Sequence, residues 1–134
     1  MTKYEFEHSV EGVGTAAGVW ALYADVARWT EWDGSLREVS LDGEFAVGSR
    51  GKMVIEGQPP IDFVLTAVEP GVAFTDETTV PGALLRFHHR VEELGGRVRV
   101  THGVEIEGPA AQQMGPFVTA DVPEAVEALV ALAA

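Results

Sequence analysis

The chain has 134 residues, of which nine are basic and 21 are acidic, so its formal charge is −12. This length corresponds to one domain, and a hydrophobic fraction of 46% is typical of a globular protein rather than a disordered one. The negative charge disfavours DNA, RNA and anionic membranes as partners, because each requires a cationic surface that neutralises phosphate.

The sequence contains no cysteine, which excludes disulfides, thiolate metal sites and cysteine nucleophiles and suits a reducing compartment. Residues 1–10 alternate charged and apolar side chains instead of forming a basic patch and an apolar run, so we expect no signal peptide. No apolar run approaches transmembrane length. We therefore expect a soluble cytoplasmic protein, with residues 1–134 forming a single domain.

The first predicted elements are a strand and two short helices. Apolar and polar side chains alternate over residues 4–10, which predicts a strand with one buried face. Apolar residues then recur at spacings of three and four over residues 15–23, which predicts a helix with Thr15 as its N-cap. A second short helix is predicted over residues 26–30, with Asp25 as its N-cap.

From Leu36 to Glu107 the pattern changes to short β-type runs separated by glycine and proline turns, which predicts six strands of an antiparallel meander. Beyond Gly108, apolar residues return to helical spacing and predict a long C-terminal helix. Gly115–Pro116 and later Pro123 are expected to break or kink this helix, because proline lacks an amide hydrogen and clashes with the preceding turn.

This order of elements predicts an α+β fold. One N-terminal strand and six hairpin-linked strands would form a single antiparallel sheet, and its apolar face must be covered. The terminal helix is the expected cover.

The hairpin closed by the Gly95–Gly96 turn allows a residue-level prediction, because a two-residue turn places Leu94 opposite Arg97 and fixes every pair behind it. In this register His89 lies directly opposite His102. Both belong to the face that carries the apolar side chains, which are Leu85, Phe87, Val91, Val98, Val100, Val104 and Ile106. The opposite face carries charge pairs, such as Arg86 with Glu105, and is expected to look outward.

An unpaired polar group inside an apolar face costs about 1–3 kcal/mol, so the two imidazoles need water, a partner or a ligand. They could be hydrogen-bonded without a further role, contact a ligand, or act as a general acid and base, since histidine titrates near neutrality. Metal ligation has less support, because no HxH or HExxH spacing is present. Asp76 is expected to turn inward near the pair, whereas His8 and His88 are expected to face solvent.

Four segments resemble the START/Bet v 1-like (SRPBCC) superfamily, specifically its bacterial polyketide cyclase/dehydrase and lipid-transport branch. They are VWALYADVARWTEWDG from Val19, FHHRVEEL from Phe87, RVRVTHGVEIEGP from Arg97, and the closing ADVPEAVEALVALA. The resemblance covers nearly the whole chain. It implies a helix-grip fold, in which a curved seven-stranded antiparallel sheet wraps a long C-terminal helix and leaves a hydrophobic cavity, with two short helices after strand one.

The resemblance also implies where a ligand would bind. The cavity would be lined by the His89 and His102 pair, with Asp76 nearby, and its apolar wall would comprise Trp32, Met53, Phe63, Phe74, Phe87, Val104 and Phe117. From their residue type alone, Trp29 and Trp32 are more often core residues than ligand contacts. The main rival fold is the cone-shaped α+β barrel of other polyketide cyclases, which normally opens with helices rather than a strand.

The sequence leaves three functions open. The first is binding or transport of a small hydrophobic or aromatic ligand, such as a lipid or a polyketide, with no cofactor and no metal. The second is a polyketide cyclase or dehydratase that uses His89 and His102 as general acid and base. The third, an oily groove for a partner protein, has no exposed apolar patch in the sequence pattern to support it.

Overall fold

The computed structural model describes residues 2–134. Across this range one antiparallel sheet has seven strands in the order β1-β7-β6-β5-β4-β3-β2, so every hairpin partner is a spatial neighbour and β1 closes onto β7. The strands are β1 (Lys3–Val13), β2 (Leu36–Asp42), β3 (Arg50–Ile55), β4 (Ile61–Glu69), β5 (Ala73–Val80), β6 (Ala83–Glu93) and β7 (Arg97–Glu107). This sheet confirms the predicted N-terminal strand and the six-strand meander.

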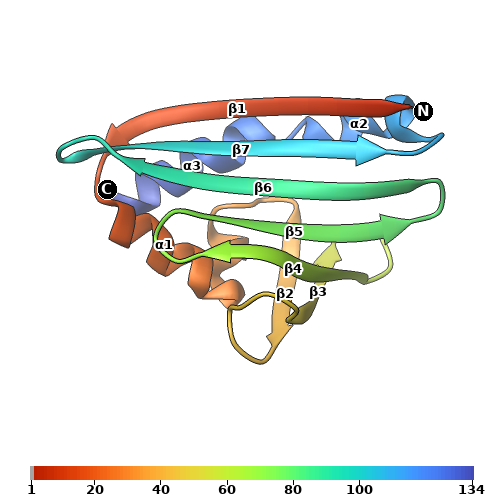
Figure 1. Ribbon diagram of the computed structural model, residues 1–134, viewed down its shortest axis with the longest axis horizontal. Coiled ribbons are helices and arrows are strands. Elements are labelled where there is room, and N and C mark those ends of the chain that lie inside the picture. Colours follow the sequence, from red (N-terminus) through yellow and green to blue (C-terminus); the bar gives the residue numbers. More distant parts are fainter. Residues whose placement is uncertain (1) are drawn as a thin grey trace.

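Helices cover one face of the sheet (Figure 1). Helix α1 (Ala16–Ala24) and the 3₁₀ helix η1 (Val26–Glu31) follow β1, and α2 (Ala111–Thr119) and α3 (Val122–Ala133) follow β7. The curved sheet gripping the terminal helices is the helix-grip fold, as predicted. Within residues 2–134, no helix is both long and apolar enough to span a bilayer.

The two short helices begin differently. Thr15 accepts a hydrogen bond at Oγ1 from the backbone N–H of Gly18 at 3.0 Å and so caps α1, as predicted. Asp25 makes no side-chain capping bond to η1, so its predicted capping role was wrong. Its backbone carbonyl instead accepts from the Arg28 N–H, the shorter-range bond of a 3₁₀ turn.

The C-terminal helical segment divides at Ala120–Asp121 into α2 and α3. Pro123 lies in the first turn of α3, where a missing amide hydrogen leaves no bond unmade. Pro116 lies inside α2 and does not end it, so the break expected at Gly115–Pro116 is found one turn later. Gly115 has another role, because a Cβ there would overlap the ring of Tyr4 on β1. Its missing side chain lets α2 approach the sheet.

The concave face has two differently filled halves. Under α1, η1 and α3, a core of buried side chains includes Val19, Tyr23, Trp29, Phe63 and Phe74. Toward α2, a smaller cluster forms around Leu85, Val104, Ile106 and Ala111. Space remains between the two clusters.

Candidate functional site

The histidine pair lies on the concave face at the junction of the two clusters. His89 on β6 is directly opposite His102 on β7, as the Gly95–Gly96 turn predicts. The two side chains are buried, with 9% and 5% of their residue surface exposed. Their ring centroids are 4.6 Å apart with the planes at 74°, so the edge of one ring meets the face of the other.

Each imidazole is held by one hydrogen bond from outside the hairpin. Nε2 of His102 lies 2.8 Å from the hydroxyl of Tyr23, which α1 brings into the sheet. Nδ1 of His89 lies 3.3 Å from the backbone carbonyl oxygen of Phe74, and the two rings stack at 4.0 Å. The helices and the neighbouring strand therefore fix both ring orientations.

Asp76 is the third polar group of this region. It is paired with Phe87 across β5 and β6, and only 2% of it is exposed. Its Oδ2 lies 4.0 Å from Nδ1 of His89, and its Oδ1 has no hydrogen-bond partner among the described residues. The inward orientation predicted for Asp76 is correct.

Burial determines the protonation of this cluster. Burial raises the pKa of Asp76 to about 8, with a smaller contribution from Glu77. Burial lowers the pKa of His102 to about 3, helped by His8, and lowers the pKa of His89 well below its usual value, helped by His102. At neutral pH both imidazoles are therefore uncharged, and Asp76 carries a proton.

A cavity of about 470 Å³ opens onto this cluster between the sheet, η1 and α2. It brings together eight of the ten predicted ligand-contacting residues, namely Trp32, Met53, Asp76, Phe87, His89, His102, Val104 and Phe117. Further lining residues include Trp29, Ser35, Leu36, Thr78, Leu85, Gln113, Met114 and Ala125. Phe117 is 83% exposed, so it borders the open side of the cavity.

Phe63 and Phe74 do not line this cavity, so their predicted place in its wall was wrong. Both face inward, but they are 2% and 1% exposed and belong to the core. Trp29 stacks against both rings, at centroid distances of 5.6 Å in each case. The indole that η1 inserts here fills the space that the prediction assigned to a ligand.

The predictions for the other two histidines had different outcomes. His8 was expected to face solvent, but it pairs with His102 across β1 and β7, is half-buried, and shares the inward face with Tyr4 and Phe6. That expectation was wrong, because His8 has the same parity as the apolar residues of its strand. His88 lies on the outer face of β6, with 42% of its side chain exposed, as predicted.

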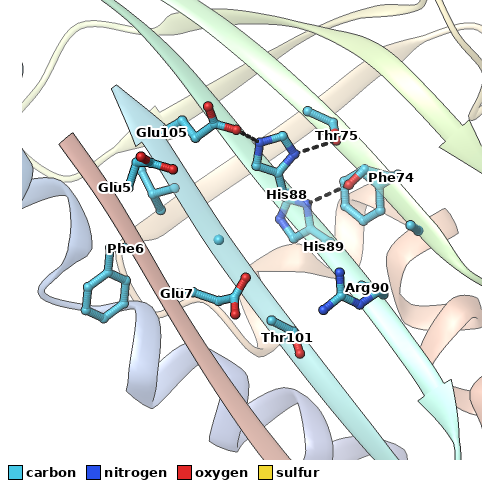
Figure 2. Close-up of a pocket in the computed structure, with 13 residues that line it drawn as sticks. Glu5, Phe6, Glu7, Phe74, Thr75, His88, His89, Arg90, Thr101 and Glu105 are labelled. Carbon is cyan, nitrogen blue, oxygen red and sulfur yellow. Dashed lines mark hydrogen bonds and ion pairs between the residues drawn. The ribbon is translucent and has the colours of Figure 1, made fainter. Parts of the chain in front are cut away.

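The outer face holds a second hollow, of about 630 Å³, whose lining includes Glu5, Glu7, Thr75, His88 and Glu105 (Figure 2). His88 bonds there to Oγ1 of Thr75 at 2.9 Å and to Glu105 at 2.6 Å. Glu105 is also paired with Lys3, which with His88 lowers the pKa of this carboxyl. These polar groups satisfy one another, in contrast to the concave cavity.

The Tyr23 hydroxyl and Trp32 Nε1 are the two polar groups of this candidate site that sequence reasoning missed. Tyr23 was placed on the buried stripe of a helix, but a periodic pattern does not reveal that its hydroxyl reaches His102 on a distant strand. Trp32 contributes more than apolar wall, because its indole N–H is buried and has no described partner. No group of three metal-ligating side chains occurs in the part of the chain that the structure describes.

The geometry defines a class of protein: a helix-grip fold with a cavity and a buried polar cluster between sheet and terminal helices. The sequence profile of the family described as polyketide cyclase/dehydrase and lipid transport matches residues 3–134. The chain belongs to this family, as its sequence motifs predicted.

Solved structures with the same fold include two kinds of protein. The Zhui aromatase/cyclase from Streptomyces sp. R1128 is 15% identical and aligns with a TM-score of 0.81 over 98% of this chain and 94% of that one. A truncated norcoclaurine synthase from Thalictrum flavum is 13% identical, with a TM-score of 0.79 over 98% of this chain and 93% of that one.

A third similar structure is the di-domain aromatase/cyclase StfQ from the steffimycin biosynthetic pathway. It is 10% identical with a TM-score of 0.81, and this chain, of which 98% aligns, covers 50% of it. No curated protein sequence matches the chain significantly. At these identities the structural likeness establishes the fold alone.

Proposed function

We propose that the protein binds a small, largely apolar or aromatic molecule, such as a lipid, a polyketide or a related metabolite, in the cavity of the concave face. One observation carries the proposal: a cavity of about 470 Å³ with mainly apolar walls contains a few polar groups, among them the cluster of Asp76, His89 and His102. Its volume lies within the roughly 300–1,000 Å³ range of small-molecule sites, which share this division between apolar wall and oriented polar groups.

The unpartnered polar atoms support the same conclusion. Trp32 Nε1 is a hydrogen-bond donor and Asp76 Oδ1 belongs to a protonated carboxyl, and each is buried without a partner among residues 2–134. Leaving such a group unpaired costs about 1–3 kcal/mol. Trp32 and Asp76 both line the cavity. A small rotation of either side chain would bring its polar atom to a polar group of a bound molecule, while Met53, Phe87, Val104 and Phe117 contact the apolar part of that molecule.

Native mass spectrometry of the purified protein and displacement of Nile red, an uncharged dye, test the proposal. Aromatic and aliphatic compounds should displace the dye from the wild type. Met53→Trp should weaken binding of the dye, because Met53 is half-buried on β3 and lines the cavity, so a larger side chain there would occupy the space of the ligand. Val47→Trp is the control, since Val47 is 63% exposed outside the cavity. Dye binding unaffected by Met53→Trp, or no displacement across a broad panel, would contradict the proposal.

A second candidate is a cyclase or dehydratase acting on a poly-β-keto compound. The observation that favours it is the approach of Asp76 to within 4.0 Å of His89 inside the cavity, together with the fold shared with aromatase/cyclases. A neutral His89 can take a proton from the carbon next to a carbonyl group. Since burial keeps both imidazoles uncharged, Asp76 rather than a second histidine would donate a proton to the carbonyl oxygen, which gives an enol.

Substitution separates the two candidates. If the protein is an enzyme, His89→Gln should abolish turnover of a poly-β-keto substrate and leave its binding nearly unchanged, and Asp76→Asn should lower turnover similarly. If the protein is a carrier, the substitutions should affect binding alone. No turnover by the wild type, together with weaker binding by the variants, would therefore favour the carrier.

Two expectations about cellular context remain part of the proposal. With a formal charge of −12, the protein should not retard DNA or RNA in an electrophoretic mobility assay. The absence of cysteine suits a cytoplasmic location, which cell fractionation with a specific antibody would test.

A further inference from the structure

Among the residues that the structure describes, the cavity is lined by acidic side chains but by no lysine or arginine. The acidic residues are Asp76, which is buried, Asp33, which is half-buried, and Asp121, which is exposed. Burial raises the pKa of Asp33, and Asp121 adds to this effect while the bonds from Ser35 oppose it. A ligand that enters this cavity therefore meets three carboxyl groups and no lysine or arginine.

A carboxylate or phosphate on the ligand would be strongly disfavoured here. Burying an anion without a cation raises the free energy of its charged form, which is the effect that burial has on Asp76. The two histidines do not compensate, because burial lowers the pKa of both and keeps them neutral. The cavity thus favours a ligand whose buried part is uncharged.

Hydrogen bonding fixes which nitrogen of His102 carries its proton. The Tyr23 hydroxyl is buried and has one described hydrogen-bond partner, Nε2 of His102 at 2.8 Å. Burial also raises the pKa of Tyr23, so the hydroxyl keeps its proton and donates it. Nε2 of His102 then accepts, and the ring proton lies on Nδ1.

His89 has its proton on Nδ1 as well, but with the opposite consequence for the cavity. A backbone carbonyl oxygen only accepts, so Nδ1 donates to Phe74, and Nε2 is left with a lone pair. Among described side chains only Trp32 Nε1 and Asp76 Oδ1 are both fully enclosed and unpartnered. The described side-chain hydrogen bonds use Nε2 of His102 and Nδ1 of His89 and leave Nδ1–H of His102 and Nε2 of His89 unused, and both residues line the cavity.

Building on the proposed function, we propose that the cavity selects uncharged hydroxyl compounds, either alcohols or phenols, whose oxygen binds between His102 and His89. The oxygen accepts a hydrogen bond from Nδ1–H of His102, and the hydroxyl proton is donated to Nε2 of His89. Ring centroids 4.6 Å apart place the two imidazoles side by side in the cavity wall. Tyr23 is a positioning residue, because it acts on the ligand through the tautomer of His102.

Isothermal titration calorimetry with four matched naphthalenes at pH 7.5 tests the proposal. The probes are 2-naphthol, its methyl ether 2-methoxynaphthalene, 2-naphthoate, and the cation 2-naphthylmethylammonium. 2-Naphthol should bind most tightly. The ether, which cannot donate to His89, should bind about tenfold less tightly, the effect of about one hydrogen bond. The carboxylate should bind at least about a hundredfold less tightly, since pH 7.5 lies roughly three units above an ordinary carboxyl pKa.

Naphthoate or the ammonium compound binding as tightly as 2-naphthol would overturn the charge selection, and equal affinities of naphthol and ether would overturn the hydroxyl assignment. In either case the proposed function survives. If none of the four compounds binds, the proposed function fails and the inference fails with it. Tyr23→Phe should reduce the preference for naphthol over the ether, whereas the control Tyr4→Phe should leave it unchanged. If Tyr23→Phe does not fold, the wild-type series decides alone.

Discussion

Removing the hydroxyl of Tyr23 is the most direct perturbation of the polar cluster. Tyr23→Phe keeps the ring, which packs edge-on against Phe74 at 4.9 Å, and deletes the oxygen bonded to His102. The lost bond is worth about 1 kcal/mol, and leaving Nε2 of His102 unpaired raises the expected cost to about 1–3 kcal/mol. The variant should therefore be less stable than the wild type without being unfolded.

Urea unfolding followed by far-ultraviolet circular dichroism measures this change. With a slope of about 2 kcal/mol per molar urea for a chain of this size, the midpoint should fall by about 0.5–1.5 M. Tyr4→Phe removes the same atom from a half-buried ring under α2 and should shift the midpoint less. Nitrogen-15 NMR of the imidazoles gives a second readout, since the wild type should show His102 protonated on Nδ1 and the variant should lose this preference.

Two results would refute the reasoning. One is a Tyr23→Phe variant with wild-type stability and an unchanged His102 spectrum, which would mean that the hydrogen bond does not hold the imidazole. The other is a wild-type spectrum with His102 protonated on Nε2, which would reverse the donor and the acceptor.

Three further predictions concern protonation and packing. The pKa of Asp76 is about 8 in the folded state and lower in the unfolded state, so its stabilising contribution is complete below about pH 4 and is lost as the pH rises through 8. Urea titrations should therefore show Asp76→Asn gaining stability relative to the wild type between about pH 4 and pH 8. Stability depends on pH in the opposite direction for His102, because its pKa is lowered to about 3 in the folded state. The wild type should therefore lose stability more steeply than His102→Gln as the pH falls from about 6.5 to 3. Gly115→Ala should lower the unfolding free energy by about 1–3 kcal/mol, because its Cβ would overlap the Tyr4 ring, and an unchanged thermal midpoint would contradict that packing.

The histidine pair could be located from sequence because its position depends on local geometry. A two-glycine turn determines the register, alternation determines the face, and both are properties of one hairpin. His89 opposite His102 follows from these two facts alone. The error for His8 arose within the same approach, since its parity matches Tyr4 and Phe6 and already indicates the inward face.

Other features of the site depend on contacts between distant segments. Phe63 and Phe74 face inward as alternation indicates, but which half of the concave face is filled depends on where η1 inserts Trp29. The bond from Tyr23 to His102 joins residues 79 positions apart and likewise requires the assembled fold. Strand patterns identify a face, whereas the docking of helices decides which part of that face is core and which part is cavity.

The placement of the tryptophans gives the protein a built-in optical reporter. Trp29 and Trp32 line the cavity, whereas Trp20 is half-buried at the border of the core, packs edge-on against Phe45 and Phe74, and is absent from the lining. Filling the cavity should change the polarity around two of the three indoles and shift their emission, while Trp20 contributes a constant background. In a Trp20→Phe variant, occupancy could then be followed in real time without any attached label.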